Sequence, residues 1–225
     1  MVNKSTHCLQ FGSTAIGVKT NEGVVLGIEK KLPSSKLMEI NKKSEKLVEI
    51  DRHCACAMSG IVGDARILID HARVEAQNHS FNFNEPMGVE AVTQAVSDLA
   101  INFGEGYEGQ KRKPMSRPYG VALLIGGVDE NGPQLFQTDP SGTYCEWQAD
   151  AIGSGQETAM TQLKEQYHSN MSLAEAEKMV LQVLKGNMEE RICKDNVEVM
   201  VVRSDTRQCE RRTPEEMERV IATLS

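Results

Sequence analysis

The sequence has no long hydrophobic run. No stretch of its 225 residues approaches the roughly 20 consecutive apolar residues that a membrane-spanning helix requires. The opening segment Met1–Gln10 is charged and lacks the apolar core of a signal peptide. We therefore expect no membrane partner and a location in the cytoplasm and nucleus.

The sequence also lacks an excess of basic residues. It has 25 Lys and Arg against 32 Asp and Glu, a formal net charge of −7, which argues against nucleic acid as the main partner. The segment Gly104–Ser116 is locally basic and rich in glycine, so a functional basic patch has to be considered. Its basic run Lys111-Arg112-Lys113 has no aromatic residues interleaved for base stacking, and a solvated loop is the expected structure.

The sequence lacks cysteines at metal-ligand spacing; those present are scattered. Cys54 and Cys56 lie two residues apart beside His53, but a zinc site would need a second pair of ligands at similar spacing. The pattern predicts reduced core thiols, no metal site and no cofactor. The six cysteines are at positions 8, 54, 56, 145, 193 and 209.

The apolar residues that are present follow two periodicities, and no stretch resembles a linker between domains. Short β-branched runs bounded by turn residues predict strands, and apolar residues three and four apart predict helices. The predicted strands are Thr14–Lys19, Gly23–Ile28, Leu47–Ile50, Cys54–Ser59, Gly120–Val128, Gln134–Thr138, Thr143–Trp147, Ala149–Ile152 and Val197–Arg203. The predicted helices are Ile61–Gln77, Val89–Phe103, Gln156–Tyr167, Ser172–Glu190 and Pro214–Thr223. The lysine-rich segment Lys30–Lys43 is expected to be an exposed loop.

Two helix starts carry specific signals. Ser172 is followed three residues later by Glu175, which predicts a capping box. Thr213 precedes Pro214, the preferred residue at a first helical position. Because helix pairs alternate with sets of hairpin-connected strands, the order predicts an α+β fold, a four-layer α-β-β-α sandwich. We expect one domain over residues 12–225, preceded by a short segment 1–11.

Several blocks of sequence resemble one family. They are Gly12-Ser13-Thr14-Ala15-Ile16-Gly17, Ser44-Glu45-Lys46-Leu47, Met58-Ser59-Gly60-Ile61-Val62-Gly63, Arg117-Pro118-Tyr119-Gly120, Asp139-Pro140-Ser141-Gly142 and Ala151-Ile152-Gly153-Ser154-Gly155. Collinear from about Phe11 to the end, they resemble the α-type subunits of the 20S proteasome. The resemblance implies the N-terminal nucleophile hydrolase fold. It also implies a non-catalytic role in a seven-membered ring, whose partners are neighbouring α-type subunits, β-type subunits and the C-terminal tails of regulatory particles.

The same resemblance implies a binding site for those tails. In the family, a lysine pairs with the tail carboxylate, and two glycine-containing turns line the pocket. By position these residues are Gly12, Lys46 and Gly60. An ammonium on a flexible stem suits a terminal carboxylate, and glycine allows another backbone to approach closely.

Two alternatives remain open at this point. Relatives with catalytic activity use an N-terminal nucleophile, whose position falls near Ser13, with Glu29 and Lys46 as the supporting carboxylate and lysine. Autolysis at Gly12-Ser13 would create such an enzyme. The second alternative concerns the N-terminus, because only Met1–Gln10 precedes Phe11, where the family usually has a gate segment and a helix. Their loss would put gate closure and ring incorporation in doubt and favour a free-standing interaction module.

Overall fold

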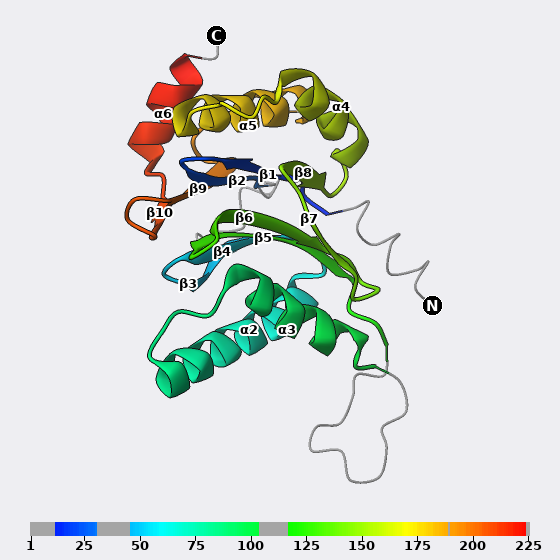
Figure 1. Ribbon diagram of the computed structural model, residues 1–225. Helices are drawn as coiled ribbons and strands as arrows, with labels where there is room; N and C mark the ends of the chain where they lie inside the picture. Colours follow the sequence, from blue (N-terminus) through cyan, green and yellow to red (C-terminus); the bar gives the residue numbers. More distant parts are fainter. Residues whose placement is uncertain (1–11, 31–45, 104–116, 189, 224–225) are drawn as a thin grey trace.

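The computed structural model describes residues 12–30, 46–103, 117–188 and 190–223 (Figure 1). Two antiparallel sheets lie face to face, and helices cover the outer face of each. The predicted four-layer α-β-β-α sandwich is therefore confirmed. The segment 1–11, the loop Gly104–Ser116 and most of the loop Lys30–Lys43 lie outside the described residues. The single-domain assignment stays a prediction.

The first sheet is built around the N-terminal hairpin. Its strand order is β10-β9-β2-β1-β8, and every neighbouring pair is antiparallel. The polar turn after Thr20 places Gly23 opposite it in the register, as the hairpin pattern predicts. The strands are β1 Ala15–Thr20, β2 Gly23–Glu29, β8 Ala149–Ile152, β9 Val197–Arg203 and β10 Cys209–Arg211.

The second sheet holds the more apolar strands. Its order is β3-β4-β5-β6-β7, a meander in which each strand pairs with the next along the chain. The run Val121–Asp129 is almost wholly buried because a sheet covers one face and helices cover the other. The strands are β3 Leu47–Asp51, β4 Cys54–Gly60, β5 Val121–Asp129, β6 Gly132–Thr138 and β7 Tyr144–Glu146.

Five described helices form the outer layers. In Figure 1, α2 and α3 lie below the second sheet, while α4 and α5 lie above the first, with α6 beside α5. The predicted capping box of Ser172 with Glu175 is present, and the predicted start at Thr213 carries a second capping box, with Glu216, that was not predicted. The helices are α2 Val62–Phe83, α3 Val89–Ile101, α4 Gln156–Gln166, α5 Leu173–Asn187 and α6 Pro214–Ala222. None of the helices in the described ranges is long and apolar enough to cross a membrane.

Three apolar clusters hold the layers together. One lies between the sheets and contains Leu26, Leu124 and Met200. The others lie between each sheet and its helices, with Leu181 in the cluster under α5 and Leu68 in the cluster over α2. Each sheet therefore buries both faces, and sites for contact with other molecules are left to strand ends, turns and outer helix faces.

A carboxylate on α2 ties that helix to the start of β5. Asp64 is buried and accepts hydrogen bonds from both terminal guanidinium nitrogens of Arg117, at 2.6 and 2.9 Å, and from the backbone N–H of Gly120 at 2.9 Å. Burial alone would raise the pKa of Asp64, but these bonds and the Arg117 charge outweigh it and lower that pKa. Arg117 therefore helps to hold α2 against the start of β5.

Two expectations about elements need correction. Helix α2 continues to Phe83, beyond the predicted end at Gln77, and stops where Asn84 takes a left-handed conformation. Strand β10, Cys209–Arg211, was not predicted at all. Its residues show no apolar alternation, and it forms because β9 offers a free edge for pairing.

The cysteine prediction holds only in part. Cys54 and Cys56 are buried thiols in the core over α2, and burial raises the pKa of each. Cys145 is exposed because it lies on the short edge strand β7, so it is not a core thiol. The five cysteines within the described ranges are all free, and those ranges contain no cluster of residues that could hold a metal.

Candidate functional site

The three predicted docking residues lie at the same end of the sandwich. Gly12 lies three residues before the start of β1, Lys46 directly precedes β3, and Gly60 is the last residue of β4. Because β3 and β4 are antiparallel, the start of one strand lies beside the end of the other. The backbone N–H of Met58 accordingly donates to the carbonyl of Lys46 at 2.9 Å.

Lys46 reaches across to the start of the first sheet. Its ammonium donates a hydrogen bond to the hydroxyl of Ser13, with Nζ 2.5 Å from Oγ. Ser13 is only 2% exposed, whereas Lys46 is half-buried. The lysine therefore keeps contact with solvent while one of its N–H groups is held by a buried side chain.

A glycine with positive φ packs between the two sheets beside this bond. Gly153 follows β8 with φ +101°, and a Cβ there would lie 2.3 Å from the Ser13 carbonyl oxygen and 2.9 Å from the Ser59 hydroxyl oxygen. Ser59 directly precedes Gly60, so Gly153 places the Ser13 segment next to the predicted Gly60 turn. The tight packing requires a residue without a side chain.

Gly60 is constrained in the same way. It has φ +122°, and a Cβ would lie 2.4 Å from the carbonyl oxygen of Gly120. That carbonyl accepts a hydrogen bond from the N–H of Ile61 at 3.0 Å. The chain can therefore turn from β4 into α2 at this point only if residue 60 has no Cβ.

Replacement of Gly60 by Ala is expected to destabilise the protein. A left-handed backbone costs a non-glycine residue about 1–3 kcal/mol, and the clash with the Gly120 carbonyl adds to this. Gly63 offers a matched control, because a Cβ at this helical position meets nothing within 4 Å. Gly63→Ala should raise the free energy of unfolding by about 0.5–1 kcal/mol. Urea denaturation should therefore show a lower free energy of unfolding for Gly60→Ala and a higher one for Gly63→Ala. Changes of the same sign would contradict the backbone strain assigned to residue 60.

One contact required by the alternative of an N-terminal nucleophile is present, but the nucleophile itself would still have to be released by cleavage. Ser13 and Lys46 do meet, as that mechanism needs. The nitrogen of Ser13, however, is in a peptide bond to Gly12, whose carbonyl accepts from the N–H of Ser154 at 3.2 Å. In the uncleaved chain Ser13 therefore has no free α-amine to act as base, and this mechanism would require cleavage of the Gly12–Ser13 bond.

Several residues around Ser13 were not predicted as part of the site. The hydroxyl of Thr14 accepts a hydrogen bond from the N–H of Gly155 at 3.1 Å, at the start of α4. Ser59 is buried, and its hydroxyl has no hydrogen-bond partner in the described part of the chain. The run Gly153-Ser154-Gly155 is visible in the sequence as a strand-to-helix turn. Nothing local indicates that it packs on Ser13, 140 positions away.

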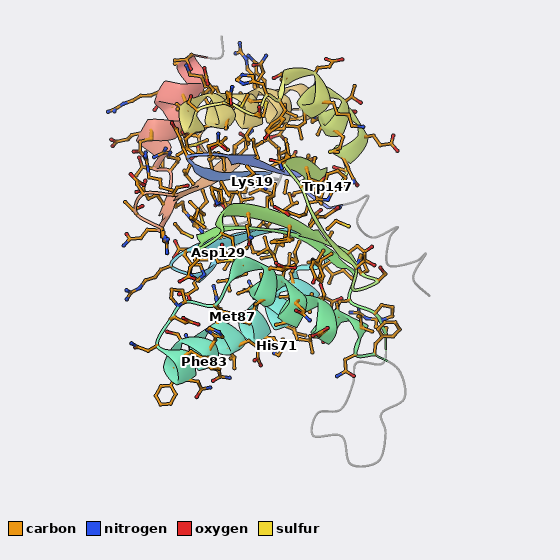
Figure 2. The ribbon with its side chains drawn as sticks, in the orientation of Figure 1. Lys19, His71, Phe83, Met87, Asp129 and Trp147 are labelled. Carbon is orange, nitrogen blue, oxygen red and sulfur yellow. The ribbon has the colours of Figure 1, made fainter. Side chains whose placement is uncertain are left out.

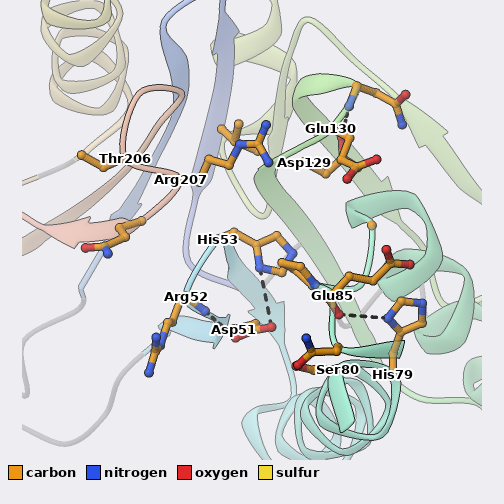
Figure 3. Close-up of a pocket in the computed structure, with 16 residues that line it drawn as sticks. Asp51, Arg52, His53, His79, Ser80, Glu85, Asp129, Glu130, Thr206 and Arg207 are labelled. Atoms are coloured by element: carbon orange, nitrogen blue, oxygen red, sulfur yellow. Dashed lines mark hydrogen bonds and ion pairs between the residues drawn. The ribbon is translucent and has the colours of Figure 1, made fainter. Parts of the chain in front are cut away.

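A cavity lies at the opposite end of the sandwich. Its volume is about 670 Å³, and it is lined by the turns after β3, β5 and β9 and by the segment between α2 and α3 (Figure 3). Its lining includes Arg52, Arg207, Glu85 and Glu130, charges of both signs that do not single out one ligand chemistry. Strand β4 runs from this end to Gly60, which at its length is roughly 20 Å away. The predicted docking residues do not line this cavity.

Comparison with known proteins gives a consistent result. A family model described as proteasome subunit matches residues 9–202. The chain is 52% identical over 204 residues to the probable proteasome subunit alpha type-5 of Schizosaccharomyces pombe, covering 91% of this chain and 81% of the relative. It is 47% identical over 220 residues to the alpha type-5 subunit of Trypanosoma brucei brucei, covering 98% and 88%. The corresponding Dictyostelium discoideum subunit is 49% identical over 218 residues, covering 97% and 89%. The sequence run Met115-Ser116-Arg117-Pro118 favours the same α-type. With its two stacked sheets and outer helices, the chain belongs to the proteasome subunit family.

Proposed function

We propose that this chain is a non-catalytic α-type subunit of the 20S proteasome that receives the C-terminal tails of regulatory particles at Gly12, Lys46 and Gly60. In this role it contributes to the α ring and to ubiquitin-dependent protein degradation in the cytoplasm and nucleus. Its partners are neighbouring α-type subunits, β-type subunits and the regulatory tails. The observation that carries the docking proposal is the ammonium of Lys46, half-buried beside two glycine-containing turns.

The chemistry of this end suits a peptide terminus. A C-terminal carboxylate carries a negative charge that a lysine ammonium can pair with, and charge-assisted hydrogen bonds are the stronger kind. Gly60 is partly exposed, and its lack of a side chain lets a foreign chain come close to the backbone of this turn, whereas Gly12 is buried behind it. A tail that enters here would therefore find one cation beside a partly exposed glycine turn.

The outer face of α2 supports assembly with other proteasome subunits. Ile67, Val74 and Phe81 are 46%, 46% and 87% exposed and lie seven residues apart, so they project from one face of the helix at two-turn intervals. Figure 2 shows Phe83 at the C-terminal end of α2, near Phe81, pointing away from the sheet; Phe83 is 65% exposed. Several large apolar side chains exposed on one helix face are typical of an interface. We assign it to a neighbouring subunit of the particle.

The docking proposal predicts a selective defect in Lys46→Ala. Tail binding should weaken about ten- to hundredfold, because a hydrogen bond to a charged group contributes about 1.5–3 kcal/mol. Ring assembly should be unchanged, since the backbone bond from Met58 to residue 46 does not depend on the side chain. Particles purified through a tag on this chain can be titrated with a tail peptide that carries a photoreactive group, and cross-links to this chain can be counted.

Lys164→Ala is the matched control, because Lys164 is exposed on α4 and outside the docking end. It should bind like the wild type. Unchanged binding by Lys46→Ala would contradict the docking proposal while leaving ring membership intact. The rival enzyme would be revealed by intact mass as a chain that begins at Ser13. A chain that never co-purifies with other proteasome subunits would instead be the free-standing module.

A further inference from the structure

We propose that Ser13 is a positioning residue of the docking site, whose buried hydroxyl holds the ammonium of Lys46 where an incoming carboxylate meets it. This inference rests on the docking function proposed above. It assigns Ser13 a role in binding that acts entirely through the lysine. Ser13 itself does not touch the ligand.

Ser13 and Lys46 differ in how deeply they are buried, and this difference assigns the contact with the tail to Lys46. Ser13 is 2% exposed and lies behind the ammonium, so a tail reaches Lys46 first. The bond joins residues 33 positions apart and links the first sheet to the second. The lysine thus depends on a contact from the other layer for its orientation.

The support behind Ser13 is rigid. The carbonyl of Gly12 on one side accepts from Ser154 at 3.2 Å, and the carbonyl of Thr14 on the other accepts from the backbone N–H of Glu29 at 2.9 Å. The carbonyl of Ser13 packs against Gly153 so closely that a Cβ there would clash at 2.3 Å. With the backbone fixed on both sides and packed in the middle, the hydroxyl of Ser13 has a fixed position.

The fixed Ser13 hydroxyl raises the affinity for the tail because it reduces the conformational entropy that the Lys46 side chain loses on binding. A free lysine side chain carries about 2 kcal/mol of rotamer entropy, and part of it is lost when the ammonium pairs with a ligand. An ammonium already held in place loses less, which is the general benefit of preorganisation. Because a single net hydrogen bond contributes about 1 kcal/mol, we expect tail binding to weaken about fivefold without the hydroxyl.

The test compares Ser13→Ala with Ser59→Ala in assembled particles. Both serines are 2% exposed at the same end of the sandwich, but the Ser59 hydroxyl has no hydrogen-bond partner within the described residues. Titration with the same photoreactive tail peptide should show about fivefold weaker labelling of this chain for Ser13→Ala and unchanged labelling for Ser59→Ala. Native electrophoresis checks that each variant enters the particle equally well. Equal weakening by both variants would overturn the proposal, since it would reflect a general disturbance of the pocket.

A double-mutant cycle with Lys46→Ala tests whether the effect passes through the lysine. If Ser13 only positions Lys46, the Ser13→Ala substitution should have no further effect in a chain that already carries Lys46→Ala. A full fivefold loss in that background would overturn the positioning role. Wild-type particles that do not label at all, or labelling insensitive to Lys46→Ala, would instead refute the docking function. The two failures are therefore distinguishable.

Discussion

Replacement of Arg212 by Ala is expected to lower the free energy of unfolding by about 3–5 kcal/mol. Arg212 lies between β10 and α6 and donates two hydrogen bonds to Glu177 of α5, at 2.8 and 3.1 Å. The side chains are 16% and 7% exposed, so the pair is largely removed from water. The variant would leave the Glu177 carboxylate buried without its counter-ion, and α6 would lose its anchor on α5. Urea denaturation of the full chain measures the change.

The exposed pair Lys194–Glu218 is the matched control. Its atoms are 3.2 Å apart, but the side chains are 44% and 68% exposed, so Lys194→Ala should change stability by less than about 1 kcal/mol. The double variant Glu177→Leu/Arg212→Met should recover most of the loss, because it removes both buried charges together. A loss in Arg212→Ala no greater than in Lys194→Ala would show that the buried pair does not hold α6 in place.

Replacement of Asp150 by Asn is expected to stabilise the protein at neutral pH by about 3 kcal/mol. Asp150 lies on β8 opposite Gly17, is 1% exposed, and has one carboxylate oxygen without a hydrogen-bond partner in the part of the chain described here. Its neighbour Ala151 faces the helix-side core, so the alternation of the strand directs Asp150 between the sheets. Burial raises its pKa from 3.8 to about 6, although a hydrogen bond from the Ala151 N–H opposes the rise.

The direction of the pH dependence follows from this raised pKa. In the unfolded chain the group ionises near pH 3.8, whereas in the folded chain it holds its proton until about pH 6. Ionisation therefore destabilises the folded state as pH rises between these values, and the penalty is complete above them. The gain from Asp150→Asn should be near zero below pH 4 and reach its maximum above pH 6. The exposed Asp98, replaced by Asn, serves as control and should show no such rise. A gain that is equal at pH 4 and pH 7.5 would contradict the assigned cause.

Local features of the fold could be read from the sequence because they depend on neighbouring residues. The hairpin of β1 and β2, the helices α3 to α6 and the caps at Ser172 and Thr213 all follow from periodicity or from side chains that bond within three residues. Strand β10 was missed because it depends on the edge of β9. The end of α2 was placed too early because polar residues replace the apolar pattern after Ala76.

The docking end shows the same division. Gly12, Lys46 and Gly60 were named from a resemblance, and the residue types themselves suggested an ammonium beside open backbone. The sequence could not show that Lys46 bonds Ser13, because that contact depends on how the two sheets stack.

By itself, the sequence determined the family, the four-layer sandwich and the positions of most strands and helices. Only the tertiary structure decided which side chains became partners: Lys46 with Ser13, Arg212 with Glu177, Asp64 with Arg117. It also decided that Cys145 is exposed and that Asp150 is buried. The physical reason is the sequence separation of the contacting residues, because periodicity and caps arise from contacts within one or two turns. These pairs lie 33 to 53 positions apart and form only when separate layers pack together.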